Sequence, residues 1–111
     1  MGDRANVLVK SSDGEVYLYT HWTGSELPQV VRSALAKKWR WDDAPYLARI
    51  IFCEMVGHNN LEDETGFGIS PVVCDGENRV IEIDVDQNSV TIGPTAMTFA
   101  KFIGSDIGWH N

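Results

Sequence analysis

The chain has 111 residues, of which 43% are hydrophobic and 23% charged, and its formal net charge is −7. This size and composition predict one globular domain spanning residues 1–111 and exclude a disordered protein. The acidic excess disfavours binding to nucleic acid or to anionic membranes, whereas it suits a basic partner surface or simply keeps the protein in solution.

The first predicted element, residues 5–22, is a β-hairpin. Two alternating segments, Ala5–Lys10 and Glu15–Trp22, flank Asp13-Gly14, which is a strong signal for a short hairpin turn. Because side chains alternate across a strand, the second segment separates into two faces. One face carries aliphatic residues and a tryptophan, and the other carries Tyr17, Tyr19 and His21.

The face with Tyr17, Tyr19 and His21 is the first candidate binding surface. Tyrosine rings offer an apolar body with a polar tip, and histidine exchanges protons near neutral pH. We expect such a face to hold a nucleobase, a peptide or a side chain of a partner. The alternative is that this face packs beneath a helix with each hydroxyl hydrogen-bonded, since half-buried strands commonly carry aromatic residues.

Two helices are predicted next, over about Ser25–Lys38 and about Asp43–Val56. The first has apolar residues at helical spacing on one face and Ser25 as its N-cap. The second has Asp42 or Asp43 as its cap and Gly57 at its end, and its apolar side chains point in nearly every direction. This second helix therefore either lies at the centre of the domain or meets another subunit, which predicts a twofold homodimer.

Charged residues interrupt the apolar surface of the second helix only at Arg49 and Glu54. A carboxylate there needs a partner, for which we considered Arg4, Arg32 or another subunit. Without a partner it becomes a candidate general base with a raised pKa. The adjacent carboxylates of Asp42 and Asp43 suit acid–base work or cation binding, but at a helix start we interpret them as caps.

The remaining elements are predicted as three strands and a short helix. After a polar loop over residues 57–66, the strands run over about Gly68–Cys74, Arg79–Asp86 and Ser89–Ile92, and the helix over Thr95–Ile103. We expect Pro71 to place its strand at a sheet edge or bulge. The order ββααβββα predicts an α+β fold, a mainly antiparallel sheet with helices layered on one face.

Other chemical signals are weak. Cys53 and Cys74 lack metal-ligand spacing, so we expect buried thiols in a reducing cytoplasm, and no signal peptide or membrane span is evident. The run Asp84–Asn88 begins with the spacing of a calcium loop but lacks the required glycine and final glutamate, so we reject a calcium site there. The acidic residues near His58 could gather a divalent metal, but we interpret them as a solvated loop. Nucleophile elbows, phosphate-binding loops and dinucleotide fingerprints are absent, so the sequence predicts no metal, no cofactor and no catalytic residue.

Several strings resemble a set of short uncharacterised bacterial and phage-borne open reading frames. The strings are GDRANV, LYTHW, ELPQVV, RWDDAPYLARIIFCEMV and TGFGIS, and they cover most of the chain. This resemblance implies a prokaryotic or phage protein. It implies no activity and assigns no site residue.

Two functions follow as hypotheses. The first is a non-enzymatic binding module that occupies a partner protein with an acidic surface, for example an anti-defence inhibitor that mimics the charge of nucleic acid. The second is a small-molecule site, or a small enzyme, for a nucleotide-like ligand. It would use Tyr17, Tyr19 and His21, with Arg49 or Arg4 for the anion.

Overall fold

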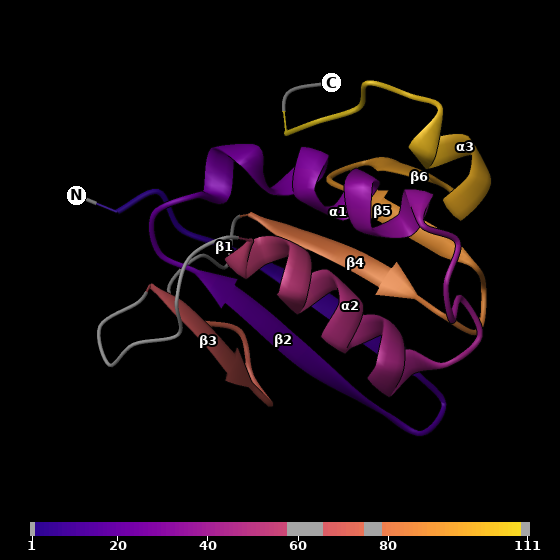
Figure 1. The fold of residues 1–111 in the computed structure, drawn as a ribbon, viewed down its shortest axis with the longest axis horizontal. Coiled ribbons are helices and arrows are strands. Elements are labelled where there is room, and N and C mark those ends of the chain that lie inside the picture. The colour runs from indigo at the N-terminus through magenta and orange to yellow at the C-terminus, as the bar shows by residue number, and fades with distance from the viewer. Residues whose placement is uncertain (1, 58–65, 75–78, 110–111) are drawn as a thin grey trace.

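The computed structural model describes residues 2–57, 66–74 and 79–109. Six strands form one sheet in the order β3-β2-β1-β4-β5-β6, in which only the pair β1–β4 is parallel (Figure 1). The strands are β1 Ala5–Ser11, β2 Gly14–Thr20, β3 Phe67–Ser70, β4 Val80–Asp84, β5 Ser89–Ile92 and β6 Thr95–Thr98. The helices are α1 Leu27–Ala36, α2 Ala44–Val56 and α3 Phe99–Ile103, with a 3-10 turn at Gly24–Glu26. The predicted α+β class and the mainly antiparallel sheet are confirmed.

The core lies between the helices and one face of the sheet. In Figure 1, α1 and α2 lie in front of the strands, and α3 lies beside α1 at the end of the sheet that holds β5 and β6. Alternate residues of the two parallel central strands, among them Val7, Val9, Ile81 and Ile83, are fully buried in this core. Each such side chain stabilises the fold by about 1.5–3 kcal/mol when it is removed from water.

Helix α2 forms as predicted because its ends carry the expected signals. The Asp43 side chain accepts a hydrogen bond from the Tyr46 N–H, and Gly57 ends the helix with a φ of +58°. The sheet, α1 and Phe67 of β3, whose ring lies against Phe52, cover most of its surface. The apolar surface of α2 is thus explained within the chain and does not require another subunit.

Helix α1 is shorter than predicted at both ends. The 3-10 turn takes its first residues, and the N-cap position belongs to Glu26 instead of Ser25. The Ser25 N–H instead donates to the Asp3 carboxylate at 3.0 Å. At the other end Lys38 has a φ of +59°, a left-handed conformation that cannot continue a right-handed helix.

The predicted helix over Thr95–Ile103 is wrong in its first half, which forms the sixth strand. Gly93 has a φ of +57° and Pro94 follows, a combination that fits the tight turn of a hairpin. The turn pairs Thr95 with Ile92, and the Thr98 side chain then caps α3 by accepting from the Lys101 N–H. Apolar spacing alone did not distinguish a short strand followed by one helical turn from a single helix.

Residues 71–74 follow β3 on the face of the sheet away from α1 and α2, where Cys74 is hydrogen-bonded to Asn6. Strands β3 and β4 point the same way but are separated by β2 and β1, so the chain must return to the start of β4. The strand predicted over Gly68–Cys74 therefore ends at Ser70, just before Pro71, and β3 is an edge strand as expected.

The two thiols that were predicted to be buried are not buried. Cys53 is exposed on α2, and Cys74, which follows β3, is partly exposed.

An ion pair joins the N-terminal segment to the start of β4. The Arg79 guanidinium donates to Asp3 at 2.6 Å, and this bond, together with the Ser25 N–H, lowers the pKa of Asp3 from 3.8 to about 2.

None of the helices in the described ranges is long and apolar enough to cross a bilayer.

The lowered pKa of Asp3 predicts a pH-dependent contribution to stability. Between about pH 2 and pH 4 the unfolded chain binds more protons than the folded chain at this carboxyl, so the stability rises with pH. The contribution is present above this window and is lost as the pH falls through it. We expect Asp3→Asn to flatten the free energy of unfolding between pH 2 and pH 4, measured by urea denaturation. An unchanged slope in the variant would contradict the assignment.

Candidate functional site

Tyr17 and Tyr19 lie on the face of the sheet away from α1 and α2. Tyr17 pairs with Leu8 and Tyr19 with Asn6, whereas the intervening Leu18 belongs to the core beneath the helices. The predicted alternation of the hairpin is confirmed, and the alternative that the tyrosines pack under a helix is wrong. Both tyrosines are half-buried, and Cys74 is held on the same face by hydrogen bonds to Asn6.

His21 continues this face beyond the end of β2. Its Nδ1 atom lies 2.8 Å from the Tyr19 hydroxyl, and its ring meets Trp22 edge-on with ring centroids 5.2 Å apart. Arg4 is exposed beside it, since the Asp3 N–H donates to the His21 carbonyl at 2.7 Å. Tyr17, Tyr19 and His21 therefore share one face, and the chain next to Arg4 runs beside His21.

Arg49 is not part of this face. It lies on the exposed side of α2, where its guanidinium carbon is 4.5 Å from the centre of the Tyr46 ring. Because α2 covers the opposite face of the sheet from Tyr17, the predicted site with Arg49 as its anion ligand does not assemble. Glu54 pairs with Lys37, whose Nζ is 3.6 Å from its Oε1, and this partner differs from the ones predicted.

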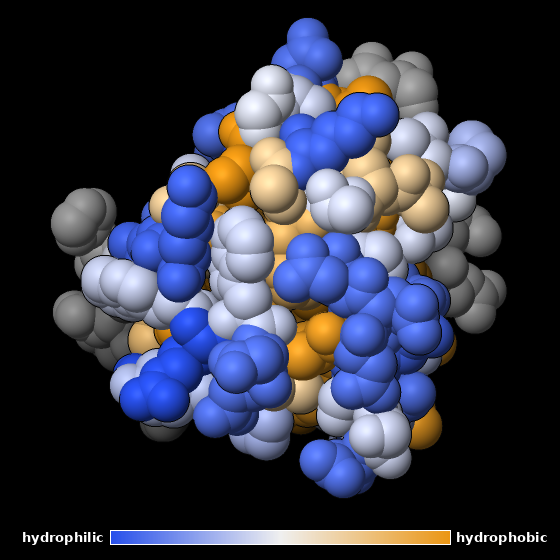
Figure 2. Space-filling model, turned by 90° about the vertical axis from the view of Figure 1, so that its right-hand side faces the viewer, coloured by the Kyte–Doolittle hydropathy of each residue, from blue (hydrophilic) through white to orange (hydrophobic). Residues whose placement is uncertain are grey.

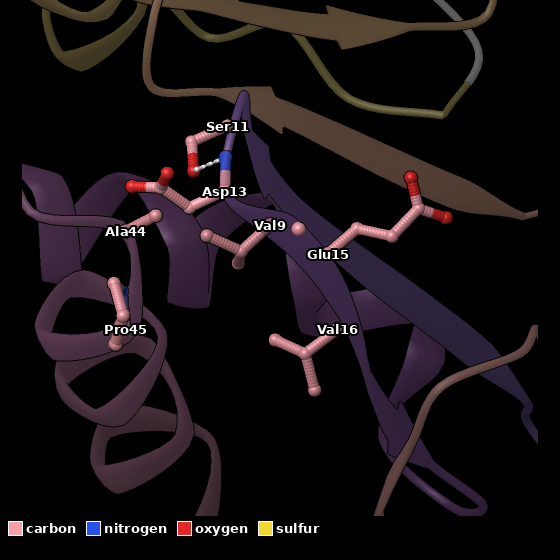
Figure 3. A pocket seen from close by; sticks show the side chains of 8 residues that line it. Val9, Ser11, Asp13, Glu15, Val16, Ala44 and Pro45 are labelled. Atoms are coloured by element: carbon pink, nitrogen blue, oxygen red, sulfur yellow. Dashed lines mark hydrogen bonds between the residues drawn. The ribbon is translucent and has the colours of Figure 1, made fainter.

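A different cavity opens at the end of the sheet where β1 and β4 finish. It has a volume of about 310 Å³ and lies between the hairpin and the start of α2. Figure 3 shows Val9 and Val16 of the hairpin opposite Ala44 and Pro45 of α2, with Ser11 and Asp13 at the rim and Glu15 directed away. The hairpin extends past the first turn of α2, and this leaves the Val16 side chain partly exposed, whereas Val9 is buried.

A second, polar cavity of about 360 Å³ adjoins the first and shares four lining residues with it. Besides the shared residues it is lined by Arg40, Asp42, Asp43, Val85 and Asp86. We call the two cavities together the acidic recess. Figure 2 looks onto this end of the molecule, where hydrophilic residues border a hollow in which hydrophobic atoms are visible.

The carboxylates of the acidic recess differ in how they are held. Asp43 is the helix cap, and Asp86 accepts from the Ser12 N–H at 2.6 Å. Within the described ranges neither Asp13 nor Asp42 forms an ion pair. A group with an apolar stem and a cationic head therefore meets both an apolar floor and uncompensated negative charge here.

The described part of the acidic recess holds no cluster of metal ligands. Across residues 2–57, 66–74 and 79–109 no three His, Cys, Asp or Glu side chains gather closely enough to hold a metal ion. The lining residues include no histidine and no cysteine. The acidic loop around His58, weighed as a metal site in the sequence, lies outside the described residues.

Sequence reasoning missed the acidic recess because each of its residues has a local explanation. Asp13 belongs to a turn, Asp42 and Asp43 to a helix start, and Asp86 to the turn between β4 and β5. No spacing links these positions along the chain, and the parallel pairing of β1 with β4 brings them to one end.

No protein-family model, curated protein or solved structure matches the chain.

Proposed function

We propose that this chain is a non-enzymatic binding protein that holds a basic segment of a partner protein in the acidic recess. The observation that carries the proposal is an apolar cavity of about 310 Å³ whose neighbouring cavity is lined by Asp13, Asp42, Asp43 and Asp86. This combination suits lysine or arginine, which bury a methylene stem and keep a charged head near water.

The charge of the whole chain supports the same partner class. A net charge of −7 attracts a basic partner over several ångströms and speeds the encounter, more strongly at low salt. The affinity itself comes from the apolar floor and from the desolvated contacts at the centre of the interface. Arg40 is the one cation among the described residues that line the recess, and it restricts how a basic segment is oriented.

An inhibitor of prokaryotic or phage origin that mimics nucleic acid is a specific form of this proposal. The partner would then be a protein whose basic groove normally holds a phosphate backbone. This form predicts that nucleic acid and the chain compete for one partner surface. The resemblance of the sequence strings and the acidic charge support it.

Charge reversal at the rim tests the proposal. We expect Asp42→Lys to weaken the binding of a fluorescein-labelled peptide of alternating Lys and Leu about tenfold, because a like charge then faces the ligand. The measurement is fluorescence anisotropy at low and at physiological salt. Glu26→Lys is the matched control, because Glu26 is exposed at the start of α1 and its side chain caps no N–H.

The two variants have the same net charge, so they separate a local site from a general attraction. Equal loss of affinity in both would show that only the overall charge acts, and the acidic recess would lose its role. No binding of the peptide by the native chain at low salt would overturn the proposal.

A further inference from the structure

The exposed side of the α1–α2 connection carries a cluster of cations and aromatic rings on an acidic protein. We call it the cationic–aromatic patch. Four of the nine Lys and Arg residues of the chain belong to it. Its members are Lys37, Lys38, Trp39, Arg40, Tyr46 and Arg49.

Two guanidinium groups converge on one ring in the patch. The Arg40 and Arg49 guanidinium carbons lie 4.8 and 4.5 Å from the centre of the Tyr46 ring. Within the described ranges neither arginine has a carboxylate within 4.0 Å. Within these ranges no carboxylate neutralises either guanidinium, so each can hold an anion.

Trp39 is held out into solvent beside these arginines. Its side chain is 60% exposed, and the Lys37 ammonium lies 5.4 Å from the centre of its ring. Lys38 and Arg40 on either side both have left-handed backbones, with φ of +59° and +58°, which is uncommon for residues other than glycine. The backbone of the connection thus presents an indole and two flanking cations outward.

A cavity of about 300 Å³ lies against these side chains. Its lining includes Lys37, Trp39, Tyr46 and Arg49, with Ile50 and Cys53 as the apolar part. Glu54 is the single carboxylate among the described lining residues, and it is paired with Lys37. The cavity therefore offers an exposed indole, an apolar wall and an arginine that no carboxylate neutralises.

We propose that the cationic–aromatic patch binds a nucleoside phosphate, with the base on Trp39 and the phosphate on Arg49 in the cavity that both residues line. Tryptophan stacks on any base, and guanidinium groups match phosphate oxygens in pairs. The net charge of −7 does not prevent this, because at physiological salt charges more than about 8 Å away are largely screened. The site is independent of the proposed function, although Arg40 borders both surfaces.

Calorimetry with ATP, AMP and tripolyphosphate tests the proposal on the native chain. We expect ATP to bind with a Kd below about 1 mM and more tightly than tripolyphosphate, because only ATP can stack. Trp39→Ala should weaken ATP about tenfold and leave tripolyphosphate unchanged. Arg49→Gln should weaken both ligands.

Two controls report on surfaces elsewhere. Trp22→Ala removes another exposed indole, 58% exposed at the end of β2, and Lys101→Gln removes an exposed cation of α3. Both should bind ATP like the native chain, and circular dichroism should show every variant folded. Equal affinity for ATP and tripolyphosphate, or ATP binding that Trp39→Ala leaves intact, would overturn the proposal, as would no binding of any nucleotide.

A labelled dT oligomer distinguishes the two sources of such a ligand. Binding that is much tighter than that of AMP, and that weakens steeply with salt, supports a single-stranded nucleic acid. Similar affinity for AMP and the oligomer supports a free nucleotide. Either result supports the proposed binding site, because both ligands present a base and a phosphate to the same residues.

Discussion

Replacing Phe99 with alanine is expected to lower the free energy of unfolding by about 3–5 kcal/mol. The Phe99 side chain is fully buried, and its ring meets the Trp41 ring edge-on with centroids 5.3 Å apart. The Trp41 indole N–H donates to the Leu35 carbonyl at 3.1 Å near the end of α1. Phe99 therefore supports both the core and the connection between α1 and α2, and its loss leaves a cavity where three segments meet.

Urea denaturation followed by circular dichroism measures this loss. A domain of this kind has about 5–15 kcal/mol of total stability, so the variant is expected to be partly unfolded at elevated temperature. Ile69→Ala is the control for a large apolar side chain that is 63% exposed, and it should cost less than about 1 kcal/mol. A loss below about 1 kcal/mol for Phe99→Ala would contradict the packing described.

Replacing Asn6 with alanine is expected to cost about 2–4 kcal/mol, although Asn6 is polar and lies on the face away from the helices. Its side chain is fully buried, and it makes two hydrogen bonds to Cys74. Nδ2 donates to the Cys74 carbonyl at 2.6 Å, and Oδ1 accepts from the Cys74 N–H at 3.2 Å. Alanine leaves the carbonyl and the N–H of Cys74 without these partners.

A second variant separates these hydrogen bonds from simple side-chain volume. Asn6→Asp keeps the shape and the acceptor for the Cys74 N–H, but the ionised carboxylate cannot donate to the carbonyl. We therefore expect Asn6→Asp to be destabilised at neutral pH at least as much as Asn6→Ala. If the aspartate variant were as stable as the native chain, the donated hydrogen bond would have no part in holding Cys74.

Interactions between near neighbours made several features predictable. The alternation of β2 placed Tyr17 and Tyr19 on one face, and the residues Asp43 and Gly57 marked both ends of α2. In each case the deciding interaction spans only a few residues, so no knowledge of distant segments was needed. Cys53 shows the limit of such reasoning, because an apolar helix residue was expected to be buried and is exposed.

The candidate sites depend on contacts between segments far apart in the chain. Arg49 and Tyr17 lie on opposite sides of the molecule because α2 covers one face of the sheet and Tyr17 lies on the other. The acidic recess exists because β1 pairs in parallel with β4, whose partner residues, such as Lys10 and Asp84, are far apart in the chain.

The sequence by itself determined the α+β class, the hairpin, the start and end of α2 and the total charge, since these follow from local residue patterns and from composition. Only the tertiary structure decided where the charges gather, with carboxylates at one end of the sheet and cations around Tyr46. The reason is physical. Electrostatic and apolar contacts depend on distance in space, and long-range strand pairing sets that distance independently of position in the sequence.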